Sequence, residues 1–348
     1  MNRIKEILVI GSLVIVIISL TSINHTNTVP VDEIEMESVT FILGSDRTIH
    51  NPYYEKAASY YRNNVNNRTE RVVTHCTSLF EVQEYLTNNR TKNGLPWGHI
   101  NLVSHGNQYL GLSMKITPDG KRTTAERLHK SLEKGSLIEI PTYAISNSTK
   151  IELHGCGIGK DEELVSEISK AFSNDTVSPQ VIANEYFEYY VTDFFNEEKI
   201  IRFNAEYWFI RYKMGYRPND RLVIRRLNNL YPDDSINWKE ALSKTSASEP
   251  GEVFHYTFDI PVKWVFRYDS KDSVPILNSK KSRLRWASEN KRIMSDLEKL
   301  EIQPEEINWW MRNIYVKNPD GSKTPALWVK GYCTILCVLR LKSDELSN

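Results

Sequence analysis

Apolar and polar residues follow one another in short blocks through the first half of the chain, and the blocks predict strands and helices in turn. Five apolar, β-rich runs predict strands, at residues 39–43, 71–76, 100–104, 150–154 and 180–183. Helical patterns lie between them, at residues 53–65, from 78 onward, 124–134 and 161–172. This alternation predicts a mostly parallel sheet with helices on both faces. The carboxyl ends of its strands then share one edge, where open α/β sheets build their sites.

Local signals mark where several of these elements begin and end. Ser78 is followed three residues later by Glu81, which predicts a capping box at the start of a helix. Gly135 closes the helix predicted at residues 124–134, and acidic residues fill the first turn of the helix that begins at Asp161. The polar stretch around Pro118-Asp-Gly120 predicts a hairpin.

The pattern changes after Tyr190. Strands are predicted at residues 206–212 and 253–260, an amphipathic helix at 281–300, and a hairpin at 309–341 whose turn is 318–321. The sequence does not decide whether residues 191–348 form a separate domain or extend the first sheet. We therefore treat them as a mixed α+β extension of the core at residues 38–190.

The first residues carry a targeting signal. Arg3 and Lys5 precede an apolar run from Ile7 to Leu20, and polar residues follow. This pattern predicts that residues 1–23 are a secretory signal peptide or an uncleaved membrane anchor, with residues 24–37 as a linker. The run is short for a full membrane span, yet no clean cleavage site follows it, so both forms stay open. In either case the body of the protein is expected outside the cytoplasm, secreted or anchored to the membrane.

Composition and cysteine usage exclude several classes of protein. Basic and acidic residues both number 44, so the net charge of +0 argues against a nucleic-acid binder. Four cysteines, at positions 76, 156, 333 and 337, are too few for a disulfide scaffold and lack the spacing of a zinc site. Cys333 and Cys337 are predicted to be buried in one strand, roughly 13 Å apart and unbonded. The histidines show no metal-ligand spacing, and we expect neither a metal nor a cofactor.

Two of the predicted strands end in chemically suggestive residues. The third runs directly into His105-Gly106, and the fourth ends at His154 and is followed by Gly155-Cys156-Gly157. If these strands are neighbours in a parallel sheet, their ends lie on one edge with the strands about 4.8 Å apart, a spacing at which an imidazole and a thiol can meet. A thiol needs such a neighbour because the thiolate is the nucleophile and a nearby imidazolium lowers its pKa. The backbone N–H groups of Gly106 and Cys156 are candidates to hold an oxyanion.

These residues resemble a known family. An apolar strand ending in His-Gly, followed by a second ending in a small residue and Cys, is similar to the clan CD cysteine peptidases, the group of caspases, gingipains, clostripain and CHAT proteins. The resemblance covers residues 39–190 and implies a caspase-like three-layer sandwich. It implies His105 as catalytic acid or base, Cys156 as nucleophile, and Gly106 with Cys156 as oxyanion donors. It also implies a protein or peptide substrate, selected mainly by the residue before the cleaved bond. Glu185, just past the fifth strand, is our candidate for selecting a basic residue there.

Other interpretations remain. His154 departs from the family pattern and competes as a partner of Cys156, although a structural role is favoured for it. An α/β-hydrolase is a poor fit, because its nucleophile needs small residues two positions away on each side, where this chain has His154 and Ile158. The stronger alternative is a catalytically inactive protein that keeps the caspase-like fold as a binding module at the cell surface.

Overall fold

The computed structural model describes residues 36–46, 52–63, 70–193, 196 and 199–345. The predicted signal peptide or anchor at residues 1–23 lies outside this range, as does the linker up to residue 35. Within the described part of the chain, no helix combines the length and hydropathy needed to span a bilayer. The described residues belong to one unit that covers residues 36–348.

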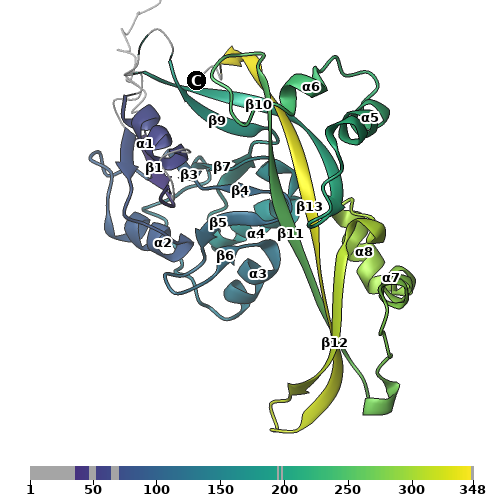
Figure 1. The fold of residues 1–348 in the computed structure, drawn as a ribbon. Helices are drawn as coiled ribbons and strands as arrows, with labels where there is room; N and C mark the ends of the chain where they lie inside the picture. The colour runs from purple at the N-terminus through teal and green to yellow at the C-terminus, as the bar shows by residue number, and fades with distance from the viewer. Residues whose placement is uncertain (1–35, 47–51, 64–69, 194–195, 197–198, 346–348) are drawn as a thin grey trace, which may run out of the picture. The chain divides into compact units, whose positions relative to one another are not determined.

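A parallel sheet of five strands forms the first half of this unit (Figure 1). Its order is β2-β1-β3-β7-β8, and every neighbouring pair is parallel. The strands are β1 (Ser38–Ile42), β2 (Glu70–Val73), β3 (His99–Val103), β7 (Lys150–His154) and β8 (Gln180–Ala183). The predicted α/β class with a parallel sheet is therefore confirmed, and each strand lies where the apolar pattern placed it.

Helices cover both faces of this sheet because the strand residues alternate between the two sides. On one face Val39, Leu102 and Leu153 are buried in a core with residues of three helices. These helices are α2 (Leu79–Asn88), α3 (Ala125–Glu133) and α4 (Glu162–Phe172). On the other face, Ile42 and Val103 pack against α1 (Tyr53–Asn63). Around this second contact the same face carries polar residues, and these become part of the site described below.

The predicted helix caps and hairpin are present. The side chain of Ser78 accepts a hydrogen bond from the N–H of Glu81, and Asp161 accepts one from the N–H of Leu164. Gly135 has a φ of 61° directly after α3, in the left-handed region that favours glycine. The hairpin belongs to a small antiparallel sheet of β4 (Gly106–Asn107), β5 (Gly111–Lys115) and β6 (Arg122–Thr123).

The second half of the chain forms its own antiparallel sheet. Its order is β11-β13-β10-β9, and β12 also pairs with β13. The strands are β9 (Phe187–Thr192), β10 (Ile200–Lys213), β11 (Val253–Arg267), β12 (Asn308–Lys317) and β13 (Lys323–Glu345). This sheet begins at Phe187, so β9 spans the boundary that the sequence pattern suggested at residue 190. Cys333 and Cys337 are buried in β13 with free thiols, as predicted.

Helices lie on both sides of this second sheet as well. One side packs on α5 (Asp220–Leu230) and α6 (Trp238–Ala241), the other on α7 (Lys280–Glu289) and α8 (Lys291–Lys299). Short 3-10 turns complete the second half, namely η2 (Lys271–Ser273) and η3 (Pro304–Glu306). The single helix predicted at residues 281–300 is wrong, because the chain leaves the helical conformation at Asn290. Its side chain accepts from the N–H of Ile293 and so caps the start of α8.

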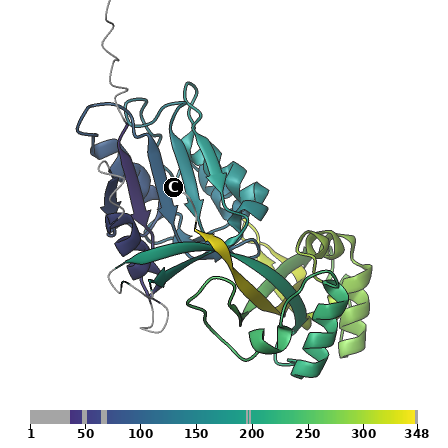
Figure 2. The same cartoon turned by 90° about the horizontal axis from the view of Figure 1, so that it is seen from above.

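The antiparallel sheet packs against the carboxyl edge of the parallel sheet. Tyr109, in the loop after β4, contacts Phe209 of β10 with ring centroids 5.6 Å apart. The hydroxyl of Tyr109 also accepts a hydrogen bond of 2.8 Å from Arg211. In Figure 2 the arrowheads of the parallel strands point toward the antiparallel sheet. The edge that carries the predicted site residues is therefore enclosed by the second half of the chain.

Candidate functional site

His105 and Cys156 leave neighbouring strands at equivalent positions. In the parallel pair of β3 and β7, Val103 lies opposite His154. A hydrogen bond of 2.9 Å from the N–H of Ser104 to the carbonyl of His154 continues the pairing past the last residue of β3. His105 and Cys156 each lie two residues beyond the last paired residue of their strand. The structure therefore places the two predicted residues at equivalent positions just beyond the carboxyl ends of two adjacent strands.

Two tyrosines at the start of α1 hold the His105 ring. The ring of Tyr53 stacks on it with centroids 4.3 Å apart, and the ring of Tyr54 meets it edge-on at 4.8 Å. The hydroxyl of Tyr54 also accepts a hydrogen bond of 3.0 Å from the backbone N–H of His105. Burial first, then nearby groups that include Cys156, raise the pKa of Tyr53. Tyr53 is thus in contact with His105 and in the electrostatic surroundings of Cys156.

The Cys156 thiol faces the second sheet. Its Sγ is 3.9 Å from the backbone carbonyl of Glu188 in β9, within the range of a weak S–H hydrogen bond. The half-buried side chain packs against the aromatic and aliphatic core of the antiparallel sheet, which includes Phe187. Burial, then the negative charge of Glu188, raise the pKa of the thiol to about 12. The chain alone therefore holds Cys156 as a neutral thiol near pH 7, in contrast to the lowered pKa expected from the sequence.

The glycines around the thiol allow close approach of backbone segments. A Cβ added at Gly106 would lie 2.8 Å from the carbonyl oxygen of Gly111, so only glycine fits between β4 and β5 there. Gly157 has a φ of 65°, and a Cβ there would lie 3.0 Å from the ring of Phe187. The chain can therefore turn sharply after Cys156 beneath the second sheet. The role of Gly106 and Cys156 as oxyanion donors stays a prediction.

Glu185 lies beside the turn that follows Cys156. That turn is η1 (Ile158–Lys160), and it is bound to the loop between β8 and β9. The N–H of Gly157 donates to the carbonyl of Tyr186, and the N–H of Gly159 donates to the carbonyl of Asn184, both at 2.9 Å. Glu185 stands between these two contacts with its side chain exposed. The structure thus places this acidic side chain near the candidate nucleophile.

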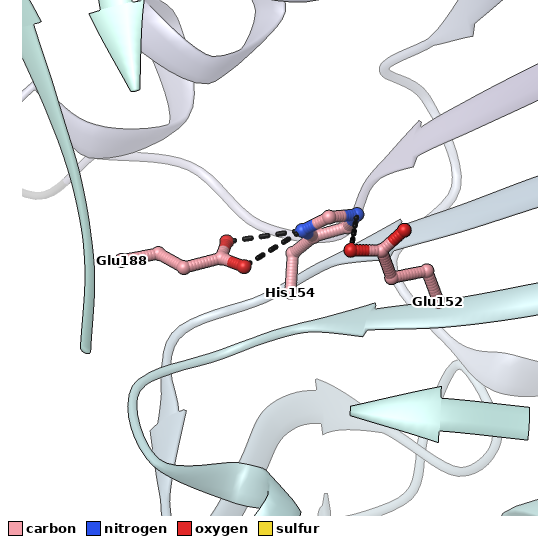
Figure 3. Close-up of side chains that lie close together, drawn as sticks. All are labelled: Glu152, His154 and Glu188. Carbon is pink, nitrogen blue, oxygen red and sulfur yellow. Dashed lines mark hydrogen bonds and ion pairs between the residues drawn. The ribbon is translucent and has the colours of Figure 1, made fainter. Parts of the chain in front are cut away.

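A buried polar network lies directly behind the cysteine and centres on His154. The Nδ1 of His154 is 3.0 Å from both carboxylate oxygens of Glu188, as Figure 3 shows. Because a carboxylate only accepts hydrogen bonds, Nδ1 carries the proton of this contact. On the other side of the ring, Nε2 lies 3.0 Å from the hydroxyl of Tyr61 and 3.0 Å from the Oδ1 of Asn101. His154 is 0% exposed and is held by this network, so it does not act as a free partner for the thiol.

Arg202 of β10 supplies a positive charge to the same network. Its Nη1 donates a hydrogen bond of 3.0 Å to the hydroxyl of Tyr61 and lies 3.3 Å from the Nδ1 of His154. Burial alone would lower the pKa of Arg202. The interactions with Tyr61 and then Glu188 outweigh burial and hold this pKa above its ordinary value. The network therefore brings the buried carboxylate of Glu188 and the half-buried guanidinium of Arg202 to opposite contacts of His154, within electrostatic range of each other. It joins β7 of the parallel sheet to β9 and β10 of the antiparallel one.

The same residues offer atoms that a metal ion uses as ligands. One ligand atom each from Glu152, His154 and Glu188 lies within 4.8 Å of the others. However, the Nδ1 of His154 is in contact with Glu188, and the guanidinium of Arg202 lies at the position where a cation would be attracted. A divalent ion there would face a buried positive charge at close range. The arrangement fits a hydrogen-bonded ionic network better than a metal centre.

Glu152 gives this network a dependence on pH. Its side chain is 25% exposed and lies 3.2 Å from His99 and 3.7 Å from His154. Burial alone would raise the pKa of Glu152, but the hydrogen bond from His99 and the charges of His154 and Arg202 lower it to about 2. A carboxyl whose pKa is lowered by folding stabilises the fold above its unfolded pKa, and this contribution is lost as the pH falls toward the folded value.

Glu152→Gln is therefore expected to reduce the free energy of unfolding by about 2–3 kcal/mol at pH 7 and by much less near pH 2. The difference between variant and wild type should shrink as the pH falls from about 4.5 to about 2, the window set by the ordinary and lowered pKa of Glu152. Urea unfolding at several pH values measures it. The exposed Glu84 is a matched control, and Glu84→Gln should change the free energy of unfolding by no more than about 0.5 kcal/mol at pH 7.

Sequence reasoning found the two strand ends and missed the side chains that surround them. Tyr53 and Tyr54 gave no signal, because tyrosines at the start of an amphipathic helix are ordinary packing residues. Glu188 and Arg202 did give a signal, because each is a single charge among apolar or aromatic neighbours. Both lie in segments where no strand was predicted. Charges in that position are buried in pairs when they are buried at all. No protein-family model, curated protein or solved structure shows significant similarity to this chain.

Proposed function

We propose that this chain is an exported cysteine endopeptidase with a caspase-like core, in which His105 and Cys156 form the catalytic dyad. The observation that carries the proposal is the register of β3 and β7, which brings both residues to the same edge at equivalent positions. The order of the five parallel strands, β2-β1-β3-β7-β8, also suits an open α/β sheet whose site lies at the carboxyl edge.

The proposed reaction proceeds through a thioester. His105 removes the proton from the Cys156 thiol as Sγ attacks the carbonyl carbon of the peptide bond, and then protonates the leaving amine. Water then releases the acyl group. The neutral thiol of the chain alone implies that deprotonation accompanies substrate binding rather than preceding it. The backbone N–H groups of Gly106 and Cys156 are proposed to stabilise the tetrahedral intermediate.

The position of Glu185 supports a preference for a basic residue before the cleaved bond. Its exposed carboxylate stands on the loop that is hydrogen-bonded to the turn after Cys156. A substrate lysine or arginine beside the acyl carbon would be attracted to this carboxylate. We propose a protein or peptide substrate on these grounds, at an extracytoplasmic location that rests on the N-terminal signal in the sequence.

The test is covalent labelling of the full chain with a peptide-like, thiol-directed inhibitor that carries a basic residue next to its reactive group. Labelling should occur at Cys156, fall by at least about 100-fold in His105→Ala, and disappear in Cys156→Ala. Site-resolved mass spectrometry from about pH 5 to about pH 9 measures it. The buried Cys76 serves as a matched control, because Cys76→Ala should leave the labelling unchanged.

One observation favours a second candidate, a binding protein on the same fold. The raised pKa of Cys156 and its packing against the second sheet are also those of an inert structural cysteine. In that case the inhibitor would label Cys156 no faster than the other thiols, and His105→Ala would make no difference. That result would reject the peptidase and favour the binding protein.

A further inference from the structure

One face of the antiparallel sheet is rich in cations and aromatic rings. Near the β12–β13 hairpin, the registers of β11, β13 and β12 bring alternate residues of three strands to the same side. We call this surface the cationic face. It consists of Lys263, Val265, Arg267, Trp328, Lys330, Tyr332, Trp310, Arg312 and Ile314.

The opposite side of the same strands is the covered one. Val262, Trp264, Val329 and Trp309 are buried there in the core shared with α7 and α8. Figure 1 shows these two helices along one side of the β12–β13 hairpin. The cationic face is therefore the solvent side of this part of the sheet. Lys263, Arg267 and Arg312 are exposed, as is Trp310 at 41%.

The cations of this face have no acidic partners in the described part of the chain. Among its ion pairs, none involves Lys263, Arg267, Arg312 or Lys330. The chain as a whole has a net charge of +0, so a cluster of one sign is not a result of its composition. Such a cluster attracts an anionic partner.

Lys263 and Lys330 make the clearest case, because they are direct cross-strand partners. Like charges in directly opposite positions destabilise a sheet. No acidic side chain among the ion pairs of the described residues offsets this repulsion, and a departure from a local rule of this kind points to a functional demand at that position. Here that demand is a locally high density of positive charge.

The aromatic rings of the face are partly occupied by its own cations. Arg312 lies over the Trp328 ring at 4.4 Å, and Lys330 lies over the Tyr332 ring at 4.6 Å. These ring faces are thus less open for stacking on sugars or bases, whereas Lys263, Arg267 and Trp310 are exposed. A flat array of Lys and Arg with interspersed Trp and Tyr suits the interface of an anionic bilayer, where cations meet phosphates and amphipathic rings sit at the headgroups.

We infer that the cationic face docks on an anionic membrane surface. In both forms predicted for the run from Ile7 to Leu20, the chain is directed to a membrane during export. The face supplies a contact that is independent of this run and of the proposed peptidase site. It would orient the folded body relative to the lipid headgroups.

The experiment compares sedimentation of the full chain with vesicles of phosphatidylcholine alone and vesicles that also contain phosphatidylglycerol. Lys263→Glu/Arg312→Glu is expected to weaken binding to the anionic vesicles by at least about 25-fold, since each basic residue near such a surface contributes about a fivefold effect. Binding of the wild type should also fall sharply between about 0.1 M and about 1 M salt. The N-terminal apolar run is the same in all variants and cancels in the comparison.

Lys121→Glu/Lys239→Glu is the matched control, because both lysines are exposed and lie on other elements. This variant should bind anionic vesicles like the wild type. The test variant should keep its free energy of unfolding within about 1 kcal/mol of the wild type, since Lys263→Glu replaces a like-charge pair by an opposite one and Arg312→Glu removes one exposed contact with the Trp328 ring. Equal binding of both variants, or no preference for phosphatidylglycerol, overturns the inference. Salt-sensitive binding to soluble polyglutamate without binding to the vesicles would also overturn it.

Discussion

Glu188→Ala is expected to lower the free energy of unfolding by about 3–5 kcal/mol, the largest effect on stability that we anticipate for a single substitution. Glu188 is 1% exposed and its carboxylate is 3.0 Å from the Nδ1 of His154. Its loss leaves the buried His154 without its carboxylate partner and removes a negative charge that acts on the half-buried Arg202. Urea unfolding followed by circular dichroism measures the change. Glu185→Ala is the control, because Glu185 lies three residues earlier and its side chain is exposed. It should change the free energy of unfolding by no more than about 0.5 kcal/mol.

A double substitution separates the ionic pairing from the packing. Glu188→Leu/Arg202→Leu removes both charges and keeps apolar volume, and should be clearly more stable than the sum of the two single substitutions predicts. Additive effects would show that the two charges are not coupled. A loss below about 1 kcal/mol for Glu188→Ala would mean that the network is open to water.

A small neutral alkylating reagent is expected to modify Cys156 about 100-fold more slowly than a free cysteine at neutral pH. Burial, then the charge of Glu188, raise the pKa of this thiol to about 12, so its thiolate fraction near pH 7 is far below that of a free cysteine. The greater nucleophilicity of a high-pKa thiolate offsets part of the deficit. Because the pKa is raised, the rate should increase about tenfold for each pH unit up to about pH 9, without a plateau. Mass spectrometry of Cys156-containing peptides measures the rate.

One result would contradict this expectation. Rapid modification of Cys156, at a rate that has already reached its plateau at neutral pH, would show that His105 keeps Cys156 as a thiolate in the free chain. Equal rates in the wild type and in His105→Ala at every pH are the expected behaviour for a small reagent. We expect the labelling rate to depend on His105 only with the peptide-like inhibitor, because deprotonation of Cys156 by His105 accompanies the binding of a substrate-like molecule.

Much of the parallel sheet could be predicted because its signals are local. Each strand is a short apolar run bounded by polar residues, and the crossover rule fixes the edge at which the strands end. The pair of His105 and Cys156 follows from that edge alone. The break at Asn290 was missed for the opposite reason: the apolar pattern continues through it, and only the capping side chain reveals two helices.

The surroundings of the proposed dyad depend on contacts between residues far apart in sequence. The network around His154 needs Tyr61 from α1, Asn101 from β3 and Glu188 from β9. Each of these is an ordinary residue of its own element, and no local pattern indicates which of them will meet. The raised pKa of Cys156 has the same origin, because it comes from burial by a sheet whose partner strands the sequence did not reveal.

The position of β13 has a consequence for biosynthesis. This strand pairs with β10, β11 and β12, and all three precede it in the sequence. None of them can acquire its central neighbour on the ribosome or during export until β13 itself has emerged. Premature termination before Lys323 would therefore leave β11 and β12 without a strand partner and β10 paired only with β9. It would also remove Cys337 and the other β13 residues from the core on which Cys156 packs. In this protein, completion of the thiol's surroundings is timed by the arrival of a segment more than a hundred residues further along the chain.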